Sequence, residues 1–373
     1  MRDTSRLPIS VPAGLRHAGI YVATLLCYLL LLSACNGDTG SNAARLNALM
    51  LHRRVTLDAT MRESGQLQIQ TFQQWIGLMQ QFNGSVGTYG QELLSDKHAL
   101  DTAKNIADYQ NALQRLRRHT TAIQIPALKN EANYQQRQLA QEATAWGKAH
   151  TYHDSYNGVT YRMGYEYSDD GMVGLVQDEL SSAKTLADYQ QAIQDATVSL
   201  INFQAYRANT SDSTSWDQAH QTDMQLMQEY HTLGQRTVVI SLSEETMRLY
   251  DQDKLVKAFH VTTGRPEKPS LPGFWVVESK QSPTVFKSDQ PKGSPYWYPD
   301  TPIHYAMLYH SGGYFLHDSW WRSDYGPNTQ FPHYDSSGDS FSFDGSHGCV
   351  NIATGNAAWV YSFVDVNTPV IVY

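Results

Sequence analysis

The sequence has little cysteine and no strongly basic stretch, and each absence excludes a class of protein. Its 373 residues contain three cysteines, which are too few for the disulfide framework of a small secreted domain. No basic run is longer than a pair such as Arg117-Arg118, and the formal net charge is -8. We therefore expect no nucleic-acid partner, because nucleic-acid-binding surfaces concentrate lysine and arginine.

A metal-binding spacing is also missing, although histidines gather near the end of the chain. The sequence has no HExxH, no CxxC and no pair of histidines four residues apart on a predicted helix, which are common arrangements of zinc ligands. We therefore expect no metal site. The side chains in this segment that could bind a metal are those of His304, His310, His317, His333, His347 and Cys349.

The N-terminal segment has the pattern of an export signal. Arg2, Arg6 and Arg16 precede an apolar stretch, Ala18 to Leu32. This stretch is shorter than the roughly 20 residues of a comfortable membrane span. It ends in Leu32-Ser33-Ala34-Cys35, which resembles the lipobox of bacterial lipoproteins.

That resemblance implies that residues 1–35 form a lipoprotein-type signal peptide and that Cys35 becomes lipid-modified. The alternative is an uncleaved signal anchor, because a short apolar segment can span a membrane when the bilayer adapts. In either case we expect the chain to be attached to the cell membrane and to face the cell wall. Residues 36–43 are polar and are predicted to form a flexible tether.

Residues 44–230 are predicted to be helical. Apolar residues recur at three- and four-residue steps, as at Phe72, Ile76 and Met79, which is typical of amphipathic helices. Residues 103–114 match residues 183–194 at 8 of 12 positions. We interpret this region as two related helical units that pack together as a bundle.

Aromatic residues in the helical region favour packing over ligand binding. Tyr109 and Tyr189 occupy the same place in the two copies, and at helical spacing we expect them in the core. Residues 152–167 are rich in tyrosine and contain the turn signal Asn157-Gly158, which predicts a packed loop or a hairpin. A break at residues 208–216 precedes one further helix, at 217–230.

After Gly234 the apolar pattern becomes that of strands. One late helix, at residues 356–364, precedes a final strand that starts at Pro369. The fold class is therefore α+β with several domains, an all-α bundle followed by a mostly-β domain at residues 236–373. The predicted strands are 237–242, 247–250, 255–263, 274–279, 303–309 and 313–316, the last of which leads into His317.

The run Ser346-His347-Gly348-Cys349-Val350-Asn351 contains the only cysteine after residue 35. A lone thiol is either a small apolar residue or a nucleophile. Gly348 permits a tight turn that exposes the sulfur, and a histidine can take the thiol proton. These neighbours favour a nucleophile.

This run resembles the Ser/Thr-His-Gly-Cys-x-Asn/Arg signature of L,D-transpeptidase (YkuD-type) catalytic domains. Residues 353–361 and 368–373 are similar to that family's closing helix and strand, so the resemblance covers residues 236–373. The run Ser270-Leu271-Pro272-Gly273 stands where the family has Thr-Pro-x-Gly and departs from that pattern.

The resemblance implies that Cys349 is the nucleophile and that a histidine at the end of an apolar strand, here His317, is its base. It also implies that Ser346, His347, Gly348 and Asn351 shape the site, bind substrate or supply backbone donors to the oxyanion.

The interval between His317 and Cys349 is longer than is usual in the family. We interpret residues 322–342 as an insertion that forms a lid or rim. His333 lies inside it and is the competing base, but we prefer His317 because rigid elements position catalytic groups better. The Asp318 carboxylate is expected either to orient the His317 ring or to face solvent. Tyr305, Trp320 and Trp321 are expected to pack in the core rather than line the acyl pocket.

The implied function is that of a peptidoglycan L,D-transpeptidase that forms 3→3 cross-links through a thioester on Cys349. Its partners would be peptidoglycan stem peptides, and no cofactor is implied because the peptide bond of the acyl donor supplies the energy. The alternatives are an L,D-carboxypeptidase, attachment of a protein to the wall, and a non-catalytic wall-binding lipoprotein. The sequence leaves open the acyl acceptor, the role of residues 44–230 and the oligomeric state.

Overall fold

A computed structural model describes residues 39–294 and 296–373, with side chains from residue 59 onward. The signal sequence predicted at residues 1–35, and with it Cys35, lies outside the described residues. Helix α1 (Thr39–Gln81) begins inside the segment predicted to be a flexible tether, residues 36–43. The chain divides into two units, residues 1–60 and 61–373. The second unit holds most of the helical region and the whole β-rich domain.

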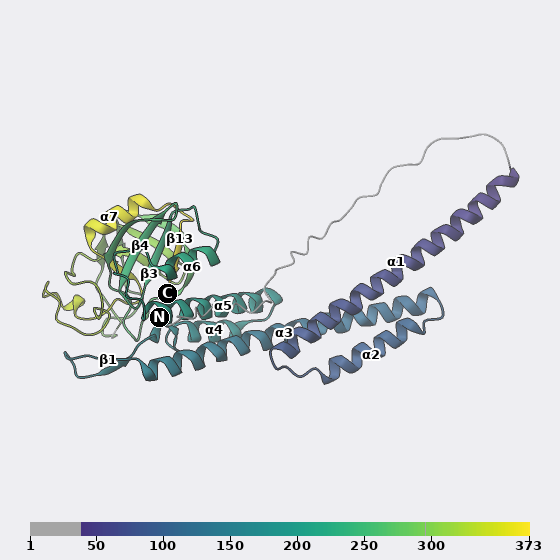
Figure 1. The fold of residues 1–373 in the computed structure, drawn as a ribbon, viewed down its shortest axis with the longest axis horizontal. Helices are drawn as coiled ribbons and strands as arrows, with labels where there is room; N and C mark the ends of the chain where they lie inside the picture. The colour runs from purple at the N-terminus through teal and green to yellow at the C-terminus, as the bar shows by residue number, and fades with distance from the viewer. Residues whose placement is uncertain (1–38, 295) are drawn as a thin grey trace, which may run out of the picture. The chain divides into compact units, whose positions relative to one another are not determined.

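The helical N-terminal region is confirmed. Helices α3, α4 and α5 run side by side (Figure 1), and none of the helices in residues 39–294 and 296–373 has both the length and the apolar character needed to cross a membrane. The helices before the β-rich domain are α1, α2 (Gly87–Asp101), α3 (Ile106–Ala149), α4 (Met172–Ser182), α5 (Leu186–Asn209) and α6 (Gln221–Glu229), with a short 3-10 turn η1 (Tyr165–Tyr167).

The sequence repeat corresponds to the starts of α3 and α5. In the first copy the Asn105 side chain accepts a hydrogen bond from the Asp108 N–H at 2.9 Å, and in the second Thr185 accepts one from the Asp188 N–H at 3.2 Å. Each cap satisfies an N–H that the first turn leaves without an intrahelical partner. Each copy therefore begins a long helix that follows a shorter one.

The tyrosine-rich segment between the two copies is a hairpin. Strands β1 (Thr151–His153) and β2 (Thr160–Arg162) pair antiparallel. Gly158 in the connecting loop has a φ of +74°, a conformation that glycine adopts without steric cost.

The β-rich domain consists of two main sheets whose facing sides form the core. The order is β5-β4-β3-β13-β6 in one sheet and β12-β11-β10-β7 in the other, and α7 (Thr354–Phe363) packs against β11. The strands are β3 (Thr237–Ser241), β4 (Thr246–Asp251), β5 (Lys254–His260), β6 (Gly273–Val276), β7 (Ser279–Gln281), β8 (Thr284–Phe286), β9 (Thr301–Ile303), β10 (Ala306–His310), β11 (Tyr314–Asp318), β12 (Val350–Ile352) and β13 (Pro369–Val372).

The strand predicted at residues 303–309 is two strands. β9 pairs with β8, whereas β10 pairs with β7 and β11. The break falls at His304 and Tyr305, whose N–H groups donate to the Asp318 carboxylate at 2.8 and 2.7 Å. A buried acid thus takes donors that a continuous ladder would use.

The last part of α3 and the helices α4, α5 and α6 share one apolar core with the β-rich domain. Phe203 and Tyr206 of α5 belong to the same buried cluster as Val238 and Val372. The Asn202 side chain donates to the backbone oxygen of Val372 at 2.8 Å. Burial of this apolar surface is the main stabilising contribution.

A buried ionic cluster adds a second connection between helix and sheet. Asp223 of α6 pairs with Arg248 of β4 at 2.6 Å, and both side chains are fully buried. The hydroxyl groups of Tyr250 and Tyr373 donate to the same carboxylate, each at 2.6 Å. Removal of Arg248 would leave the buried Asp223 charge without its cation, which is strongly destabilising.

Candidate active site

The pairing of β11 with β12 explains how the long interval between His317 and Cys349 closes. The two strands are parallel neighbours, with His317 opposite Asn351. Paired residues project to the same face of a sheet. Cys349 lies one residue before β12, and its Sγ is 3.6 Å from the backbone oxygen of Gly313, just before β11. Residues 319–349 are therefore an excursion between two adjacent strands.

His317 is held as a neutral imidazole with one nitrogen available as an acceptor. The side chain is 4% exposed, and its Nδ1 lies 2.8 Å from the backbone oxygen of Asp318. That contact requires Nδ1 to carry the hydrogen, so Nε2 is the acceptor. The Asn351 amide nitrogen lies 3.2 Å from Nε2. Burial lowers the pKa of His317, and the Asp318 carbonyl and carboxylate oppose that shift.

Cys349 is a protonated thiol in this resting arrangement. Burial raises its pKa to about 11, and the Phe315 N–H acts in the opposite direction. Burial raises the pKa of Tyr298, Tyr309 and Tyr314, and a negative charge on the Cys349 thiolate would raise it further. The aromatic side chains around Cys349 exclude water from the sulfur, so the thiolate is unfavourable unless a nearby base accepts the proton.

Ser346 organises the turn that carries the thiol. Its Oγ accepts from the Gly348 N–H at 3.0 Å and donates to the backbone oxygen of Cys349. Ser270, from the run that departs from the family pattern, donates to the backbone oxygen of Gly348 at 2.8 Å and accepts from the Gly264 N–H at 3.0 Å. Two serine hydroxyls therefore fix the turn.

Gly348 is required by both conformation and space. Its φ is +111°, which residues with a Cβ rarely adopt. A Cβ placed there would lie 2.7 Å from the Tyr314 ring. The close approach of Tyr314 to the cysteine turn therefore depends on glycine.

His347 lies at the exposed rim. Its ring centroid is 5.6 Å from that of Tyr298. Partial burial, followed by the charges of Arg265 and Lys268, lowers its pKa to about 4. His347 is therefore neutral near pH 7, and the positive charge at this rim belongs to the other two residues.

Neither expectation for the Asp318 carboxylate describes its main contacts. The residue is fully buried, so it does not face solvent. Its carboxylate binds His304 Nδ1 at 2.7 Å and two backbone N–H groups at the β9–β10 break. The backbone oxygen of Asp318, not its side chain, orients the His317 ring.

His333 is engaged inside the insertion. Its ring Nδ1 lies 2.7 Å from the backbone oxygen of Phe331. Its backbone N–H donates to the backbone oxygen of Phe343 at 2.9 Å. Its Nε2 faces Asp335 at 3.9 Å. The contacts of the described residues therefore associate His317, and not His333, with Asn351 and the cysteine turn.

The large aromatic residues divide into two groups. Trp321 lies beside His317, with ring centroids 6.1 Å apart, and Tyr305 packs against Tyr361. Trp320 is 51% exposed, so the expectation of core packing is wrong for it. Its indole N–H donates to the backbone oxygen of Pro302.

Sequence reasoning missed residues on the segment between β7 and β10. Phe286 of β8 packs edge-on against His317, with ring centroids 5.0 Å apart. Tyr298 comes from the aromatic run 296–298, which is visible in the sequence but has no signature spacing. Phe286 contacts His317, and Tyr298 contacts His347, because β8, β9 and the loop between them fold back onto the site. No local sequence pattern predicts this tertiary contact.

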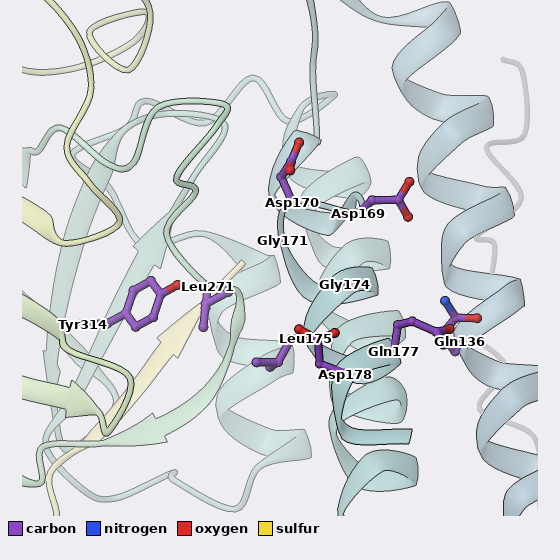
Figure 2. A pocket seen from close by; sticks show the side chains of 10 residues that line it. All are labelled: Gln136, Asp169, Asp170, Gly171, Gly174, Leu175, Gln177, Asp178, Leu271 and Tyr314. Carbon is purple, nitrogen blue, oxygen red and sulfur yellow. The ribbon is translucent and has the colours of Figure 1, made fainter. Parts of the chain in front are cut away.

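A cavity of about 490 Å³ lies between the helical region and the start of β11. Figure 2 shows Tyr314 and Leu271 on the side of the β-rich domain, and Leu175 of α4 on the opposite side, pointing toward Leu271. Tyr314 also packs on Gly348. Its ring therefore belongs both to this cavity and to the surroundings of the cysteine turn.

In the described part of the chain, no group of three or more His, Cys, Asp or Glu side chains is arranged to hold a metal ion.

Comparison with known proteins gives a family for the β-rich domain. Residues 235–372 match the family model for the L,D-transpeptidase catalytic domain, YkuD. A probable L,D-transpeptidase 3 of Mycobacterium tuberculosis is 30% identical over 112 residues, which cover 29% of this chain and 36% of that protein. L,D-transpeptidase 1 of the same organism is 26% identical over 135 residues, 35% of this chain and 48% of that protein.

Among solved structures, the catalytic domain of an L,D-transpeptidase from E. faecium is 26% identical, with a TM-score of 0.31. The match covers 38% of this chain and 98% of that one. The chain spans less than half the length of the two curated relatives.

Proposed function

Because residues 235–372 form an L,D-transpeptidase catalytic domain of the YkuD family, we propose that the chain is a peptidoglycan L,D-transpeptidase. The observation that carries the proposal is the arrangement of Cys349, His317 and Asn351 across β11 and β12. The imidazole and the amide lie on adjacent strands, and the thiol lies on the turn that leads directly into β12.

In the first step, Cys349 attacks the carbonyl carbon of the diamino-acid residue that precedes a terminal D-amino acid. The thiol proton passes to Nε2 of His317, the carbon–sulfur bond forms, and the peptide bond breaks as the proton is returned to the leaving amine. In the second step an amine of a neighbouring stem attacks the thioester, which forms a 3→3 cross-link and restores the thiol. The donor's peptide bond supplies the energy, so the scheme includes no cofactor.

Asn351 has a role in both protonation states of His317. Its amide nitrogen faces Nε2 at 3.2 Å, which suits the neutral ring. A half-turn of the amide would present Oδ1 to the imidazolium instead. The Gly348 N–H is already bonded to Ser346, so the Cys349 N–H is the proposed donor to the oxyanion.

The test is analysis of muropeptides after purified sacculi are incubated with the chain or with Cys349→Ala. The proposal expects 3→3 cross-linked products with the first protein and none with the second. Shortened stems without cross-links would indicate transfer to water, and unchanged muropeptides together with no acyl adduct on Cys349 would refute the enzymatic function.

The base is tested separately by mass spectrometry of the acyl adduct. His317→Gln should abolish acylation by a stem-peptide donor, whereas His333→Gln should retain it. The opposite result would transfer the role of base to His333.

We also propose that the chain is tethered to the membrane through a lipid on Cys35 and works outside the cytoplasm, on the cell-wall side. The lipobox-like run ending at Cys35 supports this proposal. Cys35→Ala should release the protein from the membrane fraction. Unchanged attachment would favour an uncleaved anchor.

A further inference from the structure

Two basic residues lie on a turn that is bonded directly to the cysteine turn. Arg265 and Lys268 follow β5, and the Lys268 N–H donates to the backbone oxygen of Arg265 at 2.9 Å. The Arg265 N–H in turn donates to the backbone oxygen of Ser346 at 3.1 Å. The position of both basic residues is therefore coupled to the backbone three residues before Cys349.

One aromatic ring brings the two positive charges together. The Arg265 guanidinium carbon is 5.5 Å and the Lys268 ammonium 4.8 Å from the centroid of Tyr296. Cation–π contacts of this kind are worth about 0.5–1 kcal/mol at exposed sites. Both positive charges therefore contact the same ring, that of Tyr296.

The positive charge of this pair is only partly neutralised. Asp344 lies 3.6 Å from Arg265. For Lys268, no carboxylate among residues 59–294 and 296–373 comes within 4.0 Å, and Glu267 beside it forms no ion pair with either residue. The charges also act on the site, since both contribute to the lowered pKa of His347.

We propose that Arg265 and Lys268 form a carboxylate subsite that selects the acyl-donor peptide at Cys349. The inference rests on the proposed function, because the ligand is the donor of that reaction. A stem peptide is acidic: it carries a carboxylate on its glutamyl residue and another on the terminal D-amino acid that leaves. Either carboxylate can form charge-assisted hydrogen bonds with a guanidinium and an ammonium, and amidation removes that interaction.

The experiment measures acylation of Cys349 in the full chain with three synthetic tetrapeptide donors. The first donor has free carboxylates, the second is amidated at the glutamyl α-carboxylate, and the third is amidated at the terminal carboxylate. We expect Lys268→Gln to lower kcat/KM about tenfold for the donor with free carboxylates, mainly by raising KM. This is the effect of losing one charge-assisted hydrogen bond to the carboxylate that the subsite recognises. The donor amidated at that position should react equally with both proteins.

Arg265→Lys should retain more of the preference than Arg265→Gln, because it keeps the charge. Lys257→Gln is the matched control, since Lys257 also lies over an aromatic ring, that of Trp359 at 4.9 Å, but on β5 and outside this turn. It should leave all three rates unchanged.

The outcomes separate the two proposals. If Lys268→Gln slows all donors equally or none of them, the carboxylate subsite is refuted while the transpeptidase proposal stands. If no donor acylates Cys349 in the unmodified chain, both proposals fail.

Discussion

At the scale of single residues, the reactivity of Cys349 depends on its neighbours more than on the thiol itself. Burial raises its pKa to about 11, so the sulfur is almost entirely protonated near neutral pH. His317, whose pKa is lowered by burial, is neutral under the same conditions and can accept the proton. The two shifts favour a neutral pair over an ion pair at rest.

Two pH profiles should therefore differ. Alkylation of the free protein by iodoacetamide should keep rising toward pH 11, because the reagent needs the thiolate. Acylation by a donor peptide should reach its plateau below the ordinary histidine pKa of about 6.5, because His317 takes the proton within the reaction. Cys349→Ala gives the background from the other cysteines, and alkylation that levels off near pH 8 would show that the sulfur is already ionised.

Gly348→Ala should reduce acylation about a hundredfold, the cost of misplacing a reacting group by roughly 1 Å. The Cβ would meet the Tyr314 ring in a backbone conformation that disfavours alanine. Gly355→Ala at the start of α7 is the control, since a Cβ there meets nothing within 4 Å. Equal activity of the two variants in a stopped acylation assay would contradict the close packing of the turn.

At the scale of elements, the insertion predicted at residues 322–342 is held by its own contacts and by the helical region. Arg322 is buried and donates to the backbone oxygens of Ser342 and Asp344 at 3.0 and 2.6 Å. Phe331 is fully buried and stacks on Tyr152 and Tyr161 of the β1–β2 hairpin, with both centroid distances 4.8 Å. The hairpin and the insertion therefore form one aromatic cluster.

Phe331→Ala should destabilise the folded chain by about 3 kcal/mol, as for other buried aromatic truncations. Phe341→Ala, in the same insertion but 51% exposed, should change stability by less than about 0.5 kcal/mol. Urea unfolding of both variants measures the difference. Equal midpoints would mean that the cluster contributes little.

The elements with a strong local pattern could be predicted from the sequence. The helical period, the repeat that begins α3 and α5, and most strands of the β-rich domain all depend on neighbours in the chain. The sequence predicted the cysteine turn from its signature and His317 from its place at the end of an apolar strand. The break at His304 and Tyr305 depends on Asp318, and the contact of His317 with Phe286 joins residues that are 31 positions apart in the chain. Such contacts have no local pattern.

At the scale of the whole molecule, the junction between the helices and the β-rich domain contains buried acids. Glu166 in η1 is 2% exposed, and its Oε2 has no hydrogen-bond partner in the described part of the chain. Burial raises its pKa to about 7. Glu245, which binds the N–H of Thr263 at 2.6 Å, is shifted in the same direction by burial.

Stability should therefore fall as pH rises. A raised carboxyl pKa stabilises the fold fully below about pH 4.5, and this contribution is lost between about pH 4.5 and 7. Glu166→Gln should raise stability at pH 8 by about 1–3 kcal/mol and change it little at pH 4.5. Melting curves at the two pH values test this, with exposed Glu63→Gln as the control. Because Glu245 remains, part of the pH dependence should persist in Glu166→Gln. If Glu166→Gln is less stable than the unmodified chain at pH 8, the buried Glu166 carboxylate does not destabilise the fold at that pH.

The shared core between α5 and the β-rich domain has a consequence for how such a protein can arise. Asn202 binds the final strand, and Phe203 and Tyr206 pack among residues of the sheet. A gene fragment that encoded the β-rich domain alone would expose this apolar surface and remove Asp223, one of the two carboxylates that pair with Arg248. We therefore expect the helical region and the β-rich domain to be inherited together and to coevolve. A recombinant protein that combined one region with an unrelated version of the other would fold poorly.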